Sequence, residues 1–196
     1  VDQLTPSADK IRRLMHFGQT LQSHALHFFH LCAPDLLFGF DDQVRHRNIV
    51  GLIEDEPEIA RQGVLLRRFG QEVIRATAGK RVHGTGALPG GVNRHLRPED
   101  RDALLAETDQ IVAWAEAAVG LVRRILDQHP DYHRKFGRID SNMLSLVGPD
   151  GTFELYQGRL RARAADGRSV GAGRAWGIRL CLGRRRREKQ RRGQQG

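Results

Sequence analysis

Apolar residues in the first part of the chain recur at intervals of three and four, the spacing of one helix face. We expect a helix from Pro6 to Cys32, because Thr5 and the proline after it favour a helix start and Pro34 would end the helix. A turn region should follow over residues 35–42, and a short helix over about residues 44–53. The apolar face of the first helix comprises Ile11, Leu14, Met15, Gly18, Leu21, Ala25, Phe28 and Phe29.

Two longer helices are predicted further along the chain. One begins at Pro57 and ends at Gly79, and the other runs from Pro98 to His129, where Pro130 stops it. Acidic residues at both starts suit the positive end of a helix dipole. The long helix repeats its apolar positions as a bundle helix does. These positions are Leu104, Ile111, Ala115, Ala118, Val122 and Ile125.

The spacing of apolar residues no longer follows a helical period in the last third of the chain. Met143 to Val147 and Thr152 to Tyr156 flank a Gly-Pro-Asp-Gly turn, which predicts a β-hairpin. Leu160 to Ala164 adds a third candidate strand. The predicted fold class is therefore mainly α, a long-helix bundle with a small β-hairpin or sheet near residues 141–165.

Charge is distributed unevenly along the 196 residues. The chain carries 32 Lys and Arg against 23 Asp and Glu, a net charge of +9. Residues 159–196 hold 13 basic and 2 acidic residues, leaving 19 basic and 21 acidic residues in the remainder. Most of the chain is therefore slightly acidic, and nucleic acid is not expected as a partner of this part.

Residues 168–196 are rich in Arg and Gly and show no sustained period. They are either a disordered basic tail that binds RNA or a stretch translated out of frame. We favour the second explanation because the change of character is abrupt and follows an ordinary hairpin. The predicted organisation is one unit over residues 1–167, followed by this tail.

The cellular context is indicated by what the sequence lacks. Cys32 and Cys181 are far apart and form no CxxC pair, so a disulfide framework is not expected. No apolar run approaches the roughly 18 residues that cross a bilayer, and no signal peptide is visible. We expect a cytoplasmic location. The first residue is Val rather than Met, which suggests that the chain begins partway through a longer protein.

The candidate chemistry centres on a run of histidines. His24, His27 and His30 recur every third residue, with Phe28 and Phe29 between them. On a regular helix they would span about a third of the circumference. Such a group is typical of a metal site or of a buried polar network. No HExxH motif or carboxylate completes a ligand set, so spacing alone favours histidines with non-ligand partners.

A second candidate is the loop over residues 78–92, which contains five glycines. Its spacing does not fit GxGxxG, and no GK[ST] follows, so a nucleotide-binding loop is not favoured. The favoured interpretation is that the glycines allow close approach of the backbone to a packed partner or a buried site. Cys32 lies on an apolar face and is interpreted as a core residue rather than a nucleophile.

These two segments together resemble the large subunit of nickel–iron hydrogenases. The stretch Arg12 to Asp41 is similar to the family's SHxxHFYHLxxPD helix, and the loop Gly79 to Val92 is similar to its GGKxxHPxxxxPGG segment. The similarity is greatest to the soluble, NAD-reducing, bidirectional branch. Matching positions are Ser23, His24, His27, Phe28, Phe29, His30, Leu31, Pro34 and Asp35 in the helix and His83, Pro89, Gly90 and Gly91 in the loop.

The resemblance implies a helical fold and a definite chemistry. Members of this family split dihydrogen reversibly at a nickel–iron centre that carries carbon monoxide and cyanide. Electrons pass to a small subunit with iron–sulfur clusters and then, in the NAD-linked branch, to FMN and NAD on diaphorase subunits. The family's four nickel-binding cysteines lie in two CxxC motifs, and this sequence contains neither. The chain is therefore expected to be an internal fragment, inactive alone, without the metal ligands.

The resemblance also assigns provisional roles to individual residues. His24, His27, His30 and His83 become candidates for contacts around the metal centre or for a proton relay, although each is also interpretable as a core histidine, the interpretation favoured for His30. Gly90 and Gly91 would let the backbone approach the centre or the small subunit. Two other hypotheses remain open: a helical binding module with a basic, nucleic-acid-binding tail, and a small independent histidine metalloprotein.

Overall fold

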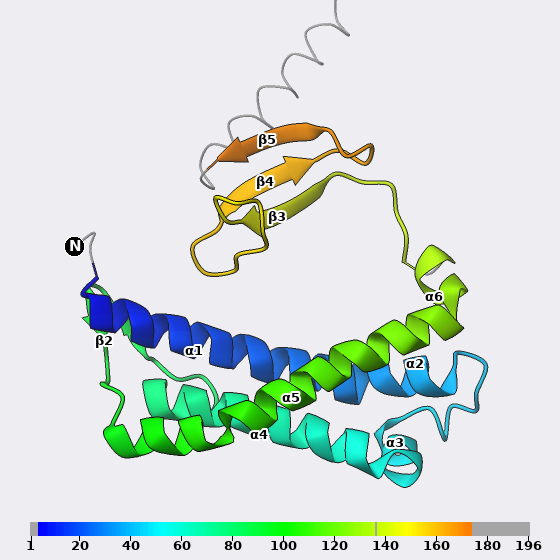
Figure 1. Ribbon diagram of the computed structural model, residues 1–196, viewed down its shortest axis with the longest axis horizontal. Helices are drawn as coiled ribbons and strands as arrows, with labels where there is room; N and C mark the ends of the chain where they lie inside the picture. The colour runs from blue at the N-terminus through cyan, green and yellow to red at the C-terminus, as the bar shows by residue number, and fades with distance from the viewer. Residues whose placement is uncertain (1–3, 136, 174–196) are drawn as a thin grey trace, which may run out of the picture. The chain divides into compact units, whose positions relative to one another are not determined.

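A computed structural model describes residues 4–135 and 137–173 of the chain (Figure 1). The chain divides into two compact units, Val1–Tyr132 and His133–Gly196, and each is considered by itself. The helices are α1 (Pro6–Ala25), the π-helix η1 (Leu26–Cys32), α2 (Ala33–Phe38), α3 (Ile49–Asp55), α4 (Pro57–Ala78), α5 (Pro98–Gln128) and α6 (Pro130–Lys135). The short strands β1 (Ala87–Leu88) and β2 (Gly91–Val92) form a two-stranded antiparallel sheet within the first unit.

The first helix does not stop at Cys32, so the prediction that Pro34 ends it is wrong. The turn before the proline is widened into η1, where the amide of Ala33 donates to the carbonyl of Phe28, five residues back. In an α-helix the Pro34 ring would clash with the carbonyl of His30. The wider turn relieves this clash, and Pro34 then occupies the first turn of α2, where its missing N–H is not needed.

The short third helix starts later than predicted. Its expected range was about residues 44–53, but α3 begins at Ile49. Asn48 is the reason, because its side-chain oxygen accepts hydrogen bonds from the amides of Val50 and Gly51, at 2.8 and 3.4 Å. By contrast, α4 and α5 begin at their predicted prolines, and each ends one residue before the position predicted.

Glycines let α1 and α4 cross closely. A Cβ atom on Gly70 would lie 2.7 Å from both the amide nitrogen of Gln22 and the carbonyl oxygen of Gly18. A Cβ on Gly18 would lie 2.5 Å from a methyl group of Val73, and Gly63 faces the Phe29 side chain with equally little room. The two helix backbones therefore touch where these small residues meet.

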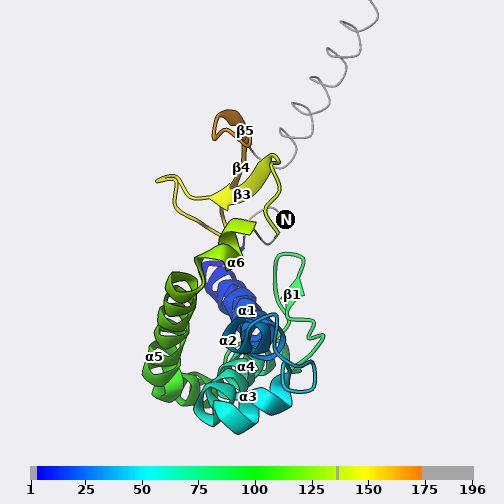
Figure 2. The same cartoon turned by 90° about the vertical axis from the view of Figure 1, so that its right-hand side faces the viewer.

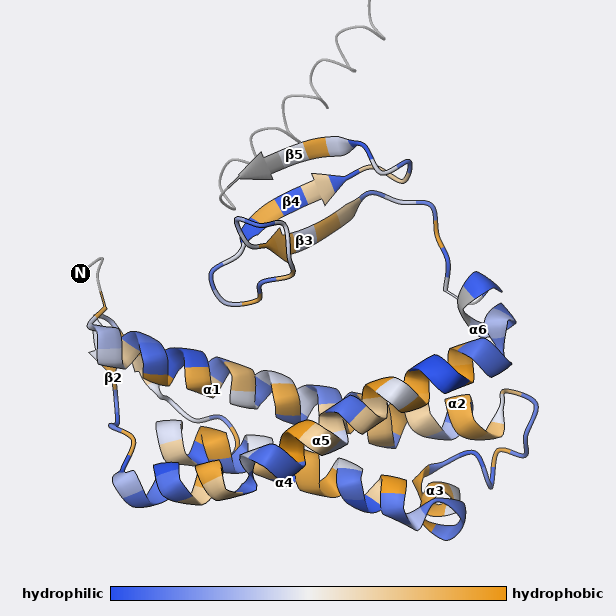
Figure 3. Ribbon diagram, in the orientation of Figure 1, coloured by the Kyte–Doolittle hydropathy of each residue, from blue (hydrophilic) through white to orange (hydrophobic). Residues whose placement is uncertain are grey.

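Two groups of buried apolar residues hold the first unit together. One lies between α1–η1, α4 and α5, and the other lies between α2, α3 and α4. The first comprises Ala25, Phe29, Leu66 and Ile111, and the second comprises Ala33, Leu52 and Ala60. In Figure 2, α5 lies on one side of the α1–α4 pair and the β1–β2 hairpin on the other. Apolar and charged residues alternate along these helices, as expected when one face is packed (Figure 3).

The second unit contains a three-stranded antiparallel sheet in the order β3 (Met143–Val147), β4 (Arg159–Arg163) and β5 (Ser169–Gly173). The prediction that Thr152 to Tyr156 forms the partner strand is wrong: the segment turns back onto β3 through one isolated bridge between Phe153 and Val147 and a 3.3 Å bond from the Glu154 amide to the Leu146 carbonyl, but it forms no strand. The Glu154 carboxylate accepts a 2.8 Å bond from the Tyr156 amide, and such local bonds compete with strand pairing.

Strand pairing continues past Gly167, where the change in composition predicts the end of the folded unit. Strand β5 begins at Ser169 and pairs with β4. Most of the Arg-rich tail, residues 174–196, lies outside the described residues, so both explanations of that tail stay predictions. Within the described ranges, no helix is long and apolar enough to cross a membrane.

Candidate functional site

The three regularly spaced histidines occupy different surroundings. His24 lies exposed on the last turn of α1, where its Nδ1 atom is 2.8 Å from the carbonyl oxygen of Thr20. Because a carbonyl only accepts hydrogen bonds, Nδ1 carries the proton. In the neutral ring, Nε2 therefore bears the lone pair.

His27 lies next to a cysteine because of the π-helix. Residues five apart face each other in η1, and the Cys32 sulfur lies 3.6 Å from Nδ1 and 3.5 Å from Nε2 of His27. The two distances are nearly equal, so the sulfur is not in line with one ring nitrogen. Burial, and then the Asp35 carboxylate, raise the pKa of the Cys32 thiol. The thiol therefore stays protonated at neutral pH, which does not favour a nucleophile.

His30 is half-buried, and its surroundings differ from those of His24 and His27. Its Nδ1 atom is inaccessible to solvent and has no hydrogen-bond partner among the described residues. The ring borders a cavity of about 330 Å³ formed by α3 and α4, with Ile49, Ile53 and Val64 among its walls. The three histidines are therefore not brought together around one point.

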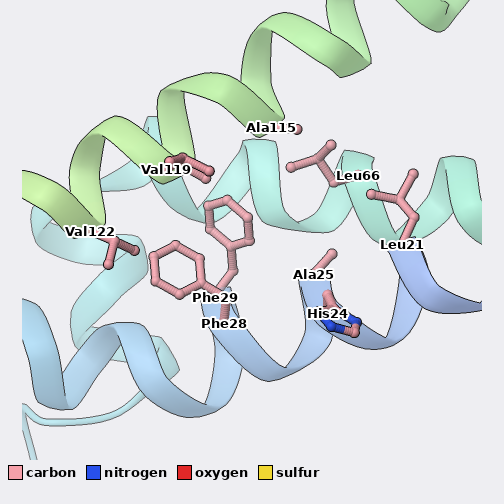
Figure 4. A pocket seen from close by; sticks show the side chains of 10 residues that line it. Leu21, His24, Ala25, Phe28, Phe29, Leu66, Ala115, Val119 and Val122 are labelled. Carbon is pink, nitrogen blue, oxygen red and sulfur yellow. The ribbon is translucent and has the colours of Figure 1, made fainter. Parts of the chain in front are cut away.

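An apolar cavity of about 190 Å³ lies beside this helix, between α1–η1, α4 and α5. Figure 4 shows the Phe28 and Phe29 rings directed from the first helix towards α5, with His24 at the edge. Ten residues line it: Leu21, His24, Ala25, Phe28, Phe29, Leu66, Ala115, Ala118, Val119 and Val122. The cavity suits a small apolar occupant, with one imidazole as the polar group.

The glycine-rich loop places its candidate residues in a short hairpin. Pro89 and Gly90 connect β1 to β2, and Gly90 has a φ of +79°, which a turn with proline before glycine requires. A Cβ atom on Gly91 would meet nothing within 4 Å, so the described residues do not force glycine there. His83 is exposed and has a φ of +52°, the left-handed region that non-glycine residues rarely adopt.

Arg12 fastens this hairpin to α1, a role that the sequence pattern did not indicate. Its Nε and Nη2 atoms donate to the carbonyl oxygen of Gly91, at 3.0 and 2.8 Å, and Nη2 also donates to the carbonyl of Leu88. One planar guanidinium thus holds both ends of the turn. The loop carrying His83 is consequently fixed to the histidine-bearing helix.

A network of ion pairs fixes the other end of the loop, and it too was missed from the sequence. Arg81 and Arg75 both pair with Glu72 on α4, and Arg75 also lies 3.0 Å from Asp100 at the start of α5. Arg97 lies 2.9 Å from the same Asp100 carboxylate. Hydrogen bonds from Arg97 first and then Arg75 lower the pKa of Asp100 to about 2.

A metal centre needs several converging ligands, and the described residues supply none. Across residues 4–135 and 137–173, no three His, Cys, Asp or Glu side chains are grouped so that they could hold a metal ion. Cys32 is the cysteine within these ranges, and its thiol contacts His27. The described part of the chain therefore does not fit a nickel–iron centre as a complete ligand set.

Comparison with known proteins gives a consistent set of relatives, although no family model matches. The chain is 39% identical over 166 residues to a subunit of the F420-non-reducing hydrogenase vhu of Methanocaldococcus jannaschii, covering 85% of this chain and 40% of that protein. It is 39% identical over 164 residues to the beta subunit of the NAD-reducing hydrogenase HoxS of Cupriavidus necator, covering 81% and 34%. The chain thus spans well under half the length of these curated relatives.

Solved structures agree with this result. An NAD⁺-reducing nickel–iron hydrogenase in the H₂-reduced state superposes with a TM-score of 0.82 at 50% identity, over 87% of this chain and 38% of that one. A nickel–iron–selenium hydrogenase of Dm. baculatum shares the fold, with a TM-score of 0.64 at 19% identity, over 85% and 38%. The predicted fold class and family resemblance are confirmed. The chain belongs to the family of nickel–iron hydrogenase large subunits, of which it spans about two fifths.

Proposed function

We propose that this chain is part of the catalytic large subunit of a cytoplasmic hydrogenase that oxidises dihydrogen reversibly to protons and electrons. The observation that carries the proposal is the superposition on the NAD⁺-reducing enzyme, at a TM-score of 0.82 over 87% of the chain. In the proposed enzyme, electrons leave through the iron–sulfur clusters of a small subunit, from which they reach FMN and NAD on diaphorase subunits. Because the chain covers about a third of its NAD-reducing relative, the activity belongs to the complete complex.

The chain's own contribution is scaffolding and positioning. A nickel–iron centre with carbon monoxide and cyanide, when bound in the complete subunit, supplies the dihydrogen-splitting chemistry. The described residues include no group of three or more His, Cys, Asp or Glu side chains that could hold it, so we assign them no step at the metal. Arg12 and Glu72 instead fix the loop that carries His83, Gly90 and Gly91.

Within this proposal, His24, His27, His30 and His83 are candidates for contacts around the centre or for a proton relay. The exposed His24 has a defined tautomer, which leaves one nitrogen able to accept a proton. His30 has a buried nitrogen without a partner among the described residues, which a neighbouring part of the complete subunit would satisfy. Gly90 and Gly91 remain candidates for backbone approach to the centre or the small subunit.

The function is tested on the complete enzyme that contains this chain, purified with its partner subunits. Dihydrogen-dependent reduction of a viologen dye tests hydrogenase activity, and reduction of NAD⁺ tests the acceptor. We expect both reactions. Dye reduction without NAD⁺ reduction would reject the NAD-linked branch, and a nickel-loaded complex inactive with both acceptors would contradict the proposed function itself.

For His83, we expect that replacement by alanine in the complete enzyme lowers dihydrogen turnover about tenfold or more, while nickel content is unchanged. The reason is that the imidazole is held on a fixed loop at a strained backbone position, which is typical of functional sites. Turnover and nickel content should be measured on the same preparation.

His83→Gly is the matched variant, because glycine relieves the φ of +52° while also removing the imidazole. If the imidazole matters, both variants lose turnover equally. If glycine retains full turnover, the residue contributes only backbone shape. His95→Ala, at an exposed histidine near the same loop, should leave turnover unchanged.

A further inference from the structure

One histidine that neither the pattern nor the resemblance singled out lies between two carboxylates. The Nδ1 atom of His46 contacts Oδ2 of Asp42, and its Nε2 atom lies 3.0 Å from Oδ2 of Asp55. The ring also packs on Phe38 at the end of α2, with 4.2 Å between the ring centroids. His46 therefore connects the turn before α3 with the last residue of α3 and with α2.

This geometry requires a charged imidazole. Ionised carboxylates only accept hydrogen bonds, so each ring nitrogen must carry a proton to bond its partner. A neutral imidazole carries one proton and would direct a lone pair at the other carboxylate. The hydrogen bond to Asp42, supported by Asp55, raises the pKa of His46 despite some loss of hydration. The same bond lowers the pKa of Asp42.

The remaining charged groups around His46 are on the same turn and on α2. Arg47 acts on the Asp42 carboxylate and pairs with Asp35 of α2, with 2.9 Å between Nε and Oδ1. Because Asp42 and Asp55 bond opposite ring nitrogens, the three side chains do not converge on one point. The group is therefore an ion-paired bridge rather than a metal site.

Helix α3 depends on this bridge for three reasons. It has seven residues, whereas isolated helices shorter than about 12 residues are marginal in water. Asp55 and its acidic neighbours Glu54 and Glu56 lie at the negative end of the helix dipole, where a cation is favourable. The backbone carbonyl of His46 also packs directly against Gly51, leaving no room for a Cβ atom.

The position of α3 determines the surroundings of His30. Leu52 is fully buried against α2 and α4, and Ile49 and Ile53 form one wall of the cavity that His30 borders. Any loosening of α3 therefore exposes that cavity, and His30 with it, to solvent.

We propose that His46 is a pH-operated clamp: its doubly protonated ring ties Asp55 to Asp42 and holds α3 over His30, and loss of one proton releases Asp55 and loosens α3. Asp55 is the bond that is released, because its contact is the longer of the two and its carboxylate is the more exposed. The clamp is a property of the fold and does not depend on the proposed hydrogenase activity.

The test uses the full 196-residue chain. Imidazole NMR signals should show that His46 titrates above the ordinary histidine pKa of 6.5. Hydrogen exchange of the α3 amides, corrected for intrinsic rates, is measured from about pH 6 to about pH 9. Opening of α3 should increase by up to about tenfold per pH unit as the pH rises from the ordinary histidine pKa of 6.5 to the His46 midpoint, and should level off above it, while the centre of α4 stays protected.

Two variants separate the clamp from general loosening. His46→Gln carries no titrating charge, and Asp55→Asn keeps the shape but not the charge; in both, corrected exchange in α3 should be high and independent of pH. His95→Gln should behave as the unmodified chain. Titration of His46 at the ordinary histidine pKa of 6.5, or a pH dependence of α3 that persists in His46→Gln, would overturn the clamp. If a variant fails to fold, the titration and exchange of the unmodified chain decide.

Discussion

Gly70→Ala is expected to destabilise the chain by about 2–4 kcal/mol, although it adds a single methyl group. The new Cβ would lie 2.7 Å from two backbone atoms of α1, the amide nitrogen of Gln22 and the carbonyl oxygen of Gly18. Backbone atoms cannot rotate away, so α1 and α4 must separate and loosen the apolar group around Phe29. Urea denaturation followed by far-ultraviolet circular dichroism measures the change.

Gly120→Ala is the matched control for this prediction. It is also a glycine inside a helix, but its new Cβ would meet only the flexible Arg124 side chain, at 3.8 Å. Because alanine favours helix, this variant should be unchanged or more stable by about 0.5–1 kcal/mol. Equal effects of the two substitutions would contradict the close helix crossing.

Asp100→Asn should be the second most damaging of the proposed changes, with a loss of about 1–2 kcal/mol at neutral pH. The carboxylate is almost completely buried and bonds Arg75 and Arg97, both of which remain partly exposed and hydrated. Its pKa falls from 3.8 to about 2 on folding. This lowering of the Asp100 pKa limits the stabilising contribution of the carboxylate to about 2.5 kcal/mol, and the hydration of both guanidinium groups reduces it further.

The pH dependence of this effect has a definite sign. Because the pKa of Asp100 is lower in the folded chain, its stabilising contribution is complete above about pH 4 and declines as the pH falls towards 2. The difference between Asp100→Asn and the unmodified chain should therefore shrink in acid. Asp102→Asn is the control, since that exposed carboxylate pairs with the exposed Arg101, and its replacement should cost less than about 0.5 kcal/mol. An equal loss at Asp102 would refute a special role for Asp100.

The parts of the fold that local chemistry determines were predictable from the sequence. Helices α4 and α5 begin at Pro57 and Pro98 and end within one residue of the predicted positions, because apolar period, proline and glycine act locally. The family resemblance rested on residues that are neighbours in sequence, and the comparisons confirm it.

Features that depend on distant residues were not predictable. The strand that pairs with β3 is β4 rather than the nearer Thr152 to Tyr156, because side-chain bonding at Glu154 diverts the nearer segment. Arg12 and Asp100 bond partners 79 and 25 residues away, and no periodic pattern records such bonds. The regular spacing of the histidines was misleading for a related reason, since the π-helix changes the angle between His24 and His30.

The widened turn also predicts how this helix tolerates changes in length. Leu31 lies on η1 with its side chain largely exposed, so its loss would remove little packing. Deleting it would nevertheless shorten the wide turn to an ordinary one, in which the Pro34 ring would clash with the carbonyl of Phe29, then four residues before it. Substitutions at Leu31 should therefore be tolerated while its deletion is not, and natural length variation should be absent between Ala25 and Pro34.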